Sequence, residues 1–225
     1  QVHHDQLGVE VLVRLAELLE ESLAEALRVR HGVQRGEEVH AAAQLGVDKV
    51  LLLPSRQPPH RASPGRLPEQ RLAMLKLAVA GDARLTIDDR ELHRAGPSFT
   101  VDTLESLRKE VGCDLSVSMM LGLDAFALLP SWHRWQDVLQ LVNVVVLTRP
   151  GAEDLSDELI ELIAERHQPP SALRDIPSGA LTRVQTTQLP ISSTLIRTDL
   201  EAGLSVHGSL PTAVIAYIRE HHLYV

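Results

Sequence analysis

Aromatic residues are scarce in this chain, because Phe, Trp and Tyr together make up 3% of its 225 residues. Each aromatic side chain that is present therefore merits attention. Cysteine occurs once, as Cys113, which excludes an internal disulfide and indicates a reducing compartment, by default the cytoplasm. No neighbouring motif supports Cys113 as a nucleophile, and an idle or buried thiol is the simpler interpretation.

Several common functional motifs are missing. The chain has neither a Walker A loop nor a G-x-G-x-x-G fingerprint, and its 11 histidines show no H-E-x-x-H pair or other metal-ligand spacing. No apolar run approaches the length that spans a membrane, and no signal-peptide pattern is visible. We therefore expect neither a protein-built metal site nor a membrane partner.

The charge balance argues against nucleic acid as the partner. The formal net charge is −8 and the sequence pI is about 5.7, which disfavours a dedicated nucleic-acid binder but allows a local basic pocket. Apolar residues make up 44% and charged residues 23%, as in an ordinary globular protein, and the length suits one α/β domain or two small ones. Oligomeric state stays open, including a homo-oligomer.

What the sequence does contain is a regular alternation of strands and helices. Apolar runs predict strands over 47–54, 84–88, 115–121, 143–148 and 183–189. Helical spacing and helix-end signals predict helices over 69–80, from 98 or 100 to 110, 123–129, 132–141, 155–166, 192–202 and 211–222. Near-continuous apolar strands that alternate with helices indicate an α/β fold with a parallel sheet covered on both faces.

Ligands in such sheets bind at the carboxyl ends of the strands, so the segments that follow the strands are the candidate site. The most informative of them is Ser192-Ser193-Thr194-Leu195-Ile196-Arg197, which opens a predicted helix. Free backbone N–H groups and the positive end of the helix dipole bind phosphate, and Arg197 adds a planar set of donors one turn later. A serine-capped helix with a surface arginine is the alternative.

Other segments offer weaker signals of the same kind. His60 and Arg61 follow the paired prolines 58–59 after a strand, where they can face an anion or form a rigid surface turn. Thr100 opens a helix whose hydroxyl and N–H groups suit a carboxylate or phosphate, although simple capping is the commoner explanation. Asp124, two residues after Gly122, can accept from a ribose or cap the next helix.

Both tryptophans of the chain lie in the segment Trp132-His133-Arg134-Trp135. If this segment begins a helix, Trp132 and Trp135 share a face. A flat ring can then stack on an indole, while a helix-start N–H meets a carboxylate on that ring. A hydrophobic anchor is the alternative interpretation.

Taken in order, these segments resemble the bacterial nicotinate-nucleotide adenylyltransferase family over about 45–224. That family transfers AMP from ATP to nicotinate mononucleotide, so the resemblance implies a Rossmann-like nucleotidyltransferase fold and a role in NAD biosynthesis. The matching segments are VLLLPSRQPPHR, RLAMLKLAV, PSFTVDTLESLR, LGLDAF, LPSWHRWQDVL, VVVLTRPG, ISSTLIR and YIREHHLY.

The resemblance implies a role for each matching position. The ATP phosphates would be held by Ser192, Ser193, Thr194 and Arg197, and Gly122 and Asp124 would face the nucleotide sugar. The nicotinate ring and its carboxylate would be held by Thr100, Trp132 and the backbone at His133. Residues near the mononucleotide would be Pro59, His60, Arg61 and Arg149. Magnesium would accompany ATP, and in-line attack would need no protein nucleophile.

The chain departs from this family over residues 1–44. The family's first strand lies inside the sheet and leads into a G-G-T-F-D-P loop and an H-x-G-H motif that contacts the ATP phosphates; this chain has no G-G-T-F-D-P. Counting back from 45, the H-x-G-H frame falls on His31-Gly32-Val33-Gln34, so His31 alone is kept from that motif; the catalytic candidates are His31 and Arg197. We therefore expect an irregular or missing first strand, unless residues 9–13 take its place, followed by an amphipathic helix over 14–30.

Two explanations of that segment stay open: a reading-frame error or upstream mis-start, and true divergence. We accordingly divide the chain into an atypical segment, 1–44, and a nucleotidyltransferase domain, 45–225. The alternatives to the leading function are a catalytically impaired nucleotide-binding relic and an adenylyltransferase with another acceptor, such as phosphopantetheine.

Overall fold

The computed structural model describes residues 10–14, 44–47, 49–54, 67–148, 155–185 and 193–224, with side chains omitted from the description at 10–14 and 193–194. In this part of the chain the strands are β1 (Glu10–Arg14), β2 (Lys49–Leu53), β3 (Leu85–Ile87), β4 (Val117–Gly122), β5 (Asn143–Thr148) and β6 (Leu181–Gln185). The helices are α3 (Pro68–Val79), α4 (Thr100–Val111), α5 (Leu123–Ala127), α6 (Trp135–Leu141), α7 (Asp157–Arg166), α8 (Ser193–Glu201) and α9 (Thr212–Glu220). Short 3-10 helices η1 (Arg90–His93), η2 (Leu129–Ser131) and η3 (Pro170–Asp175) connect them.

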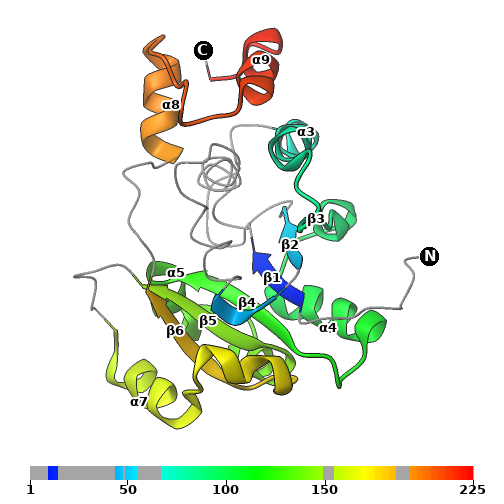
Figure 1. Cartoon of the computed structure of the whole chain (residues 1–225), viewed down its shortest axis with the longest axis vertical. Helices are drawn as coiled ribbons and strands as arrows, with labels where there is room; N and C mark the ends of the chain where they lie inside the picture. The colour runs from blue at the N-terminus through cyan, green and yellow to red at the C-terminus, as the bar shows by residue number, and fades with distance from the viewer. Residues whose placement is uncertain are drawn as a thin grey trace.

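The strands form one parallel sheet in the order β3-β2-β1-β4-β5-β6 (Figure 1). The α/β class and the parallel sheet are thus confirmed. All carboxyl ends meet at one edge, because every neighbouring pair is parallel. The order runs outward in both directions from β1 and β4, which makes their junction the topological switch point of a doubly wound sheet.

The first strand is present, so the expectation that it is irregular or missing is wrong. Glu10 lies opposite Lys49 of β2 and opposite Val117 of β4, which places β1 inside the sheet. The alternative, that residues 9–13 take this place, is confirmed within one residue. Without β1, the backbone N–H and C=O groups of β2 and β4 that face it would have no hydrogen-bond partners, which is unfavourable in a buried sheet. Residues 15–43, including the predicted helix 14–30 beyond its first residue, lie outside the described part.

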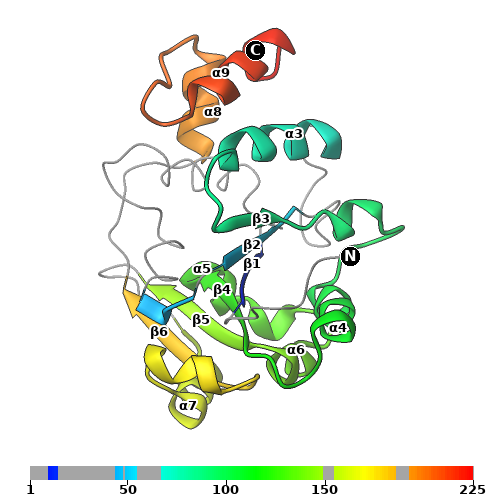
Figure 2. The same ribbon diagram turned by 45° about the vertical axis from the view of Figure 1, so that its right-hand side comes forward.

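Two hydrophobic clusters cover the two faces of the sheet. Alternate residues of β4 and β5 enter different clusters: Met120 and Val145 join α3, α8 and α9, while Met119 and Val144 join α4, α5, α6 and α7. Successive strand residues point to opposite faces, so the helices cover both, as predicted. Figure 2 shows α4 and α6 side by side in the second layer.

Helix α4 matters most for the site, and the sequence fixes both of its ends. Asp102 lies in its first turn and Arg108 and Lys109 in its last, as the helix dipole favours, and Gly112 ends it with φ of +83°. The Arg108 guanidinium also donates to four backbone carbonyls, at 2.7 to 3.1 Å, which belong to Gly112, Leu115, Leu141 and Pro177. Burial lowers the pKa of Arg108. The far end of α4 is therefore tied to three other segments.

Two predicted elements have wrong boundaries. The predicted helix 132–141 begins only at Trp135, because Arg134 adopts a left-handed conformation that no α-helix can include. The last strand begins at Leu181, before the predicted start at 183: Leu181 and Val184 are buried, and Leu181 pairs with Val144. The predicted end of this strand, over 186–189, lies outside the described residues. Most other predicted ends agree within one or two residues, the usual scatter of helix and strand ends. Among the described residues no helix has both the length and the apolar character needed to cross a membrane.

Candidate functional site

Gly122 and Asp124 lie at the switch point, where the two central strands end. Gly122 is the last residue of β4, and a Cβ atom added to it would meet no heavy atom within 4 Å. Asp124 is exposed in the first turn of α5. The carboxyl edge therefore carries open space and an acceptor group at the position where doubly wound sheets bind their ligands.

The start of α4 carries a buried hydroxyl that has no partner. Thr100, the first residue of the helix, is only 6% exposed, and its Oγ1 makes no hydrogen bond. Phe99 holds the N-cap position and has no side-chain group that could accept from the first N–H groups. A buried hydroxyl without a partner costs about 1–3 kcal/mol, so this helix start is suited to a polar ligand group.

Trp132 and His133 lie beside this helix start. The rings of Phe99 and His133 have centroids 4.5 Å apart and are tilted by 36°. The Trp132 side chain is 9% exposed and packs in the same hydrophobic cluster as α4 and α6, whereas His133 is exposed. The structure therefore brings Thr100, predicted from one motif, close to Trp132 and His133, predicted from another. Trp132 lies before α6, however, so it shares no helical face with Trp135.

Arg134 joins this turn to α4. Its Nη2 donates to Glu105 Oε1 of α4 at 2.8 Å, and its Nε donates to Asp137 Oδ2 of α6 at 2.6 Å. Hydrogen bonds to Asp137 and Glu105 raise the pKa of the Arg134 guanidinium above its ordinary value.

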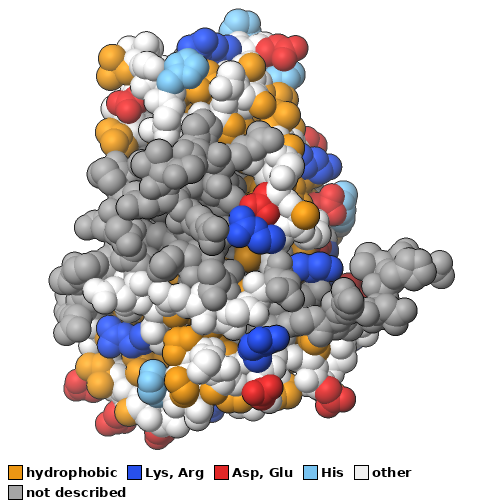
Figure 3. Space-filling view, viewed as in Figure 1, with side chains coloured by type: hydrophobic (Ala, Val, Ile, Leu, Met, Phe, Trp, Pro, Cys, Tyr) orange, Lys and Arg blue, Asp and Glu red, His pale blue; other side chains and the backbone are white. Residues whose placement is uncertain are grey.

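Figure 3 shows acidic and basic side chains interspersed among the described residues of the viewed face.

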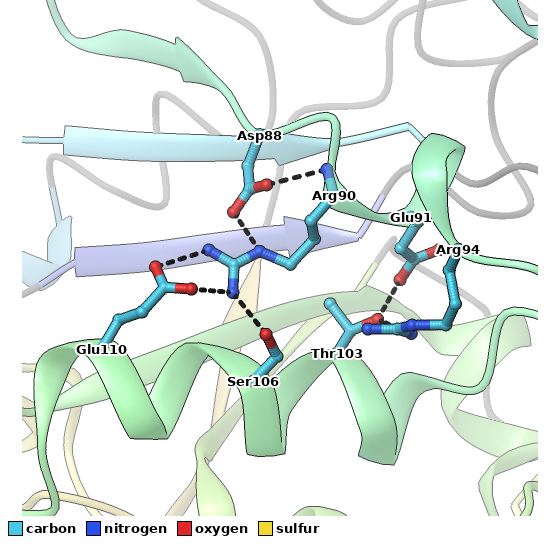
Figure 4. A network of polar contacts seen from close by, with 7 residues as sticks. All are labelled: Asp88, Arg90, Glu91, Arg94, Thr103, Ser106 and Glu110. Carbon is cyan, nitrogen blue, oxygen red and sulfur yellow. Dashed lines mark hydrogen bonds and ion pairs between the residues drawn. The ribbon is translucent and has the colours of Figure 1, made fainter.

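Helix η1 braces the side of α4 (Figure 4). Arg94 Nη1 donates to Thr103 Oγ1 at 2.8 Å, and that hydroxyl donates to Glu91 Oε1 at 2.7 Å. Glu91 is 1% and Thr103 2% exposed, so the bond between them is buried, and the bond from Arg94 is partly buried. Thr103 follows Thr100 by one turn, and the brace therefore holds the first turn of α4, which begins at Thr100.

A second set of bonds holds the other end of the same helix. Arg90 donates two hydrogen bonds to Glu110, at 2.9 and 3.0 Å, and one to Ser106 Oγ at 3.1 Å. Its Nε donates to Asp88 Oδ2 at 2.6 Å. Thr103, Ser106 and Glu110 lie three and four residues apart, so they form one face of α4 that η1 covers along its length.

The predicted phosphate-binding segment lies in the other layer. Ser193 and Thr194 begin α8, and Arg197 is half-buried within it. Ile196 of α8 belongs to the cluster that contains α3 and α9, on the opposite face of the sheet from α4 and α6. At the carboxyl edge of the sheet, residues from the two layers could contact a common ligand.

Six of the predicted site residues lie outside the described part of the chain: His31, Pro59, His60, Arg61, Arg149 and Ser192. The structure does describe the strands that lead into two of the segments that contain these residues. β2 ends at Leu53 before residues 59–61, and β5 ends at Thr148 before Arg149, both at the carboxyl edge.

Metal-ligating groups do not cluster in the described part, where no three His, Cys, Asp or Glu side chains come together. Those residues alone do not fit a metal cage. Magnesium needs few protein ligands when substrate phosphates and water complete its octahedron. The single exposed carboxylate of Asp124 at the carboxyl edge is compatible with such a metal.

Sequence reasoning missed the supporting residues of the site. Arg134 and Phe99 lie within the motifs WHRW and PSFT, but their partners Glu105 and His133 are about 30 residues away in the chain. The bonds that link Thr103 to Glu91 and Arg94 could have been suspected only from Thr103 itself, a polar residue at a helical position that faces the core.

Comparisons with known proteins identify the family of this chain. A family model described as cytidylyltransferase-like matches residues 38–199. A probable nicotinate-nucleotide adenylyltransferase of Pseudomonas aeruginosa (strain UCBPP-PA14) is 48% identical over 188 residues, which cover 83% of this chain and 87% of that protein. A protein with the same description from Pseudomonas putida (strain W619) is 45% identical over 181 residues, 80% of this chain and 83% of that protein.

Solved structures show the same fold. The nicotinic acid mononucleotide adenylyltransferase of Plasmodium falciparum, in complex with NaAD, superposes with a TM-score of 0.63 at 13% identity and covers 96% of this chain and 97% of that one. A putative nicotinate-nucleotide adenylyltransferase from Vibrio parahaemolyticus gives a TM-score of 0.55 at 13% identity, over 96% of this chain and 95% of that one. With the family match and the close relatives, the conclusion is that this chain belongs to the cytidylyltransferase-like family and, within it, to the nicotinate-nucleotide adenylyltransferases.

Proposed function

We propose that this chain transfers AMP from ATP to nicotinate mononucleotide, giving nicotinate adenine dinucleotide and pyrophosphate in NAD biosynthesis. Relatives described as nicotinate-nucleotide adenylyltransferases, 45–48% identical over most of the chain, support the reaction. The observation that carries the choice of acceptor is the unpartnered, buried hydroxyl of Thr100 beside the Trp132–His133 turn. A planar ring with one carboxylate suits an indole next to free donors.

The acceptor half of the site uses described and undescribed residues. Trp132 stacks on the nicotinate ring, and Thr100 and the His133 backbone donate to its carboxylate. Pro59, His60, Arg61 and Arg149 contact the rest of the mononucleotide, after the carboxyl ends of β2 and β5.

The ATP half combines the switch point with α8. Gly122 leaves room for the nucleotide at the end of β4, and Asp124 accepts from its sugar. Ser192, Ser193, Thr194 and Arg197 bind the phosphates through N–H groups, hydroxyls and the guanidinium. His31 is assigned to the reacting phosphates, and magnesium bound to ATP would offset part of the charge of its phosphates.

The reaction is a direct in-line displacement. A phosphate oxygen of nicotinate mononucleotide attacks the α-phosphorus of ATP; the new P–O bond forms as the bond to the β-phosphate bridging oxygen breaks, and pyrophosphate leaves. The residues of this chain act by holding the two phosphates in line and by stabilising the negative charge that shifts to the leaving group. No covalent enzyme intermediate is required.

Pyrophosphate release with ATP, magnesium and nicotinate mononucleotide tests the proposal. Release that depends on the mononucleotide supports it, and release with phosphopantetheine instead would identify the rival acceptor. Mononucleotide binding without release would identify a nucleotide-binding relic.

The N-terminal segment calls for a matched assay. We propose one domain whose segment 1–44 is altered by frame error or divergence, with β1 keeping the place of the family's first strand. A version with G-G-T-F-D-P and H-x-G-H rebuilt is expected to exceed the present chain in kcat. Resequencing the gene tests the frame-error hypothesis. If codons for G-G-T-F-D-P and H-x-G-H are absent from all three reading frames, divergence is the remaining explanation.

A further inference from the structure

The left-handed backbone of Arg134 stands out within the acceptor half of the site. Its φ and ψ are 53° and 44°, a conformation that is costly for a residue with a side chain. Among the described residues other than glycine, positive φ occurs elsewhere at His222 and Tyr224, after the last helix. Strained residues of this kind persist where surrounding contacts hold them.

The strained residue determines how the chain enters α6. Trp132 is extended, with φ of −76° and ψ of 146°, and Arg134 then reverses the direction of the chain. The carbonyl of Arg134 accepts from the N–H groups of Asp137 and Val138, at 3.0 and 3.3 Å, so the helix starts from this residue. A right-handed Arg134 would extend the helix toward Trp132 and turn the indole out of its buried position.

Two ionic contacts hold the turn in place. Arg134 bonds to Asp137 in its own helix and to Glu105 in α4, five residues after Thr100. The guanidinium therefore links the turn that carries Trp132 and His133 to the helix whose start carries Thr100. Arg134 and Glu105 are 44% and 38% exposed, so this bridge adds little to global stability, and its effect falls on the conformation of the turn.

Building on the proposed function, we propose that Arg134, through its left-handed backbone and its bond to Glu105, is a positioning residue that sets the distance between Thr100 and the Trp132–His133 turn. It thereby sets the affinity for the nicotinate ring and carboxylate of the acceptor. ATP binding, assigned to the edge of β4 and to α8, does not depend on this distance.

The test compares four variants for KM of each substrate, kcat and melting temperature. Arg134→Ala loses the bridge and keeps a side chain in the strained position; we expect KM for nicotinate mononucleotide to rise about tenfold. Arg134→Gly keeps the left-handed turn without the bridge, and Glu105→Gln keeps the arginine without its charged partner on α4; each is expected to raise that KM about threefold. Arg84→Ala is the matched control, because Arg84 is 45% exposed and pairs with Asp82 in the same way, away from the site.

KM for ATP and the melting temperature should stay near wild type in all four. Equal changes in KM for both substrates after Arg134→Ala, or an Arg134→Gly variant no better than Arg134→Ala, would overturn the proposal. Calorimetric binding of nicotinate mononucleotide separates this outcome from failure of the proposed function. If wild type binds the mononucleotide but releases no pyrophosphate, the function fails and the Kd series still decides the role of Arg134; if wild type does not bind it, both fail.

Discussion

Thr103→Val removes the central group of the buried brace between η1 and α4 while keeping the shape of the side chain. The Thr103 hydroxyl donates to the Glu91 carboxylate at 2.7 Å and accepts from Arg94 at 2.8 Å, and it lies in a position that is 2% exposed. Valine leaves the carboxylate with one donor fewer and the guanidinium with one acceptor fewer.

The magnitude follows from the charges of the partners. Hydrogen bonds to charged groups contribute roughly 1.5–3 kcal/mol, and Glu91 and Arg94 keep other interactions, so we expect a loss of about 2–3 kcal/mol in the free energy of unfolding. At about 2–4 °C per kcal/mol for a chain of this size, the melting temperature should fall by roughly 4–12 °C.

Thermal unfolding followed by far-UV circular dichroism measures this shift, with two matched controls. Thr103→Ser keeps the hydroxyl and should cost about 1 kcal/mol for its lost methyl group. Ser106→Ala removes one contact of Arg90, which retains Asp88 and Glu110, and should also cost about 1 kcal/mol or less. A Thr103→Val protein that melts within about 1 °C of wild type, or no lower than Ser106→Ala, would refute the buried-brace reasoning.

Further predictions concern the site, the sheet and acid stability. Arg197→Ala should raise KM for ATP far more than it weakens binding of nicotinate mononucleotide in calorimetry; equal losses would remove its assignment to the ATP phosphates. Thr100→Val should raise KM for the mononucleotide about tenfold with little change in KM for ATP in the pyrophosphate assay. Arg108→Ala leaves carbonyls of three segments without their donor, and urea unfolding should show a loss of about 3 kcal/mol. A hydrogen bond from Arg84 lowers the pKa of Asp82 from its usual 3.8, so its stabilisation is present above that pH and is lost as the pH falls through the lowered folded-state value. Asp82→Asn should accordingly cost less than about 1 kcal/mol at pH 7, since Arg84 is largely exposed and Asp82 partly so, and the cost should shrink as the pH falls below 3.8.

The sequence by itself determined the class of fold and most of its elements. The apolar run 144–147, flanked by Asn143 and Thr148, predicted β5 with the bounds that the structure gives, because a strand buried on both faces reads as a near-continuous apolar run. The order of short motifs along the chain was also enough to identify the family by resemblance.

Tertiary structure decided the details on which the acceptor half of the site depends. Local spacing predicted a helix from Trp132, yet a side chain 29 residues earlier, Glu105, bonds to Arg134, and the helix begins only after it. Likewise, β1 is short and follows no family motif, but two neighbouring strands supply its backbone partners. Helix and strand propensities are local, whereas the left-handed turn at Arg134 and the central place of β1 are stabilised by groups that only the folded chain brings within hydrogen-bonding distance.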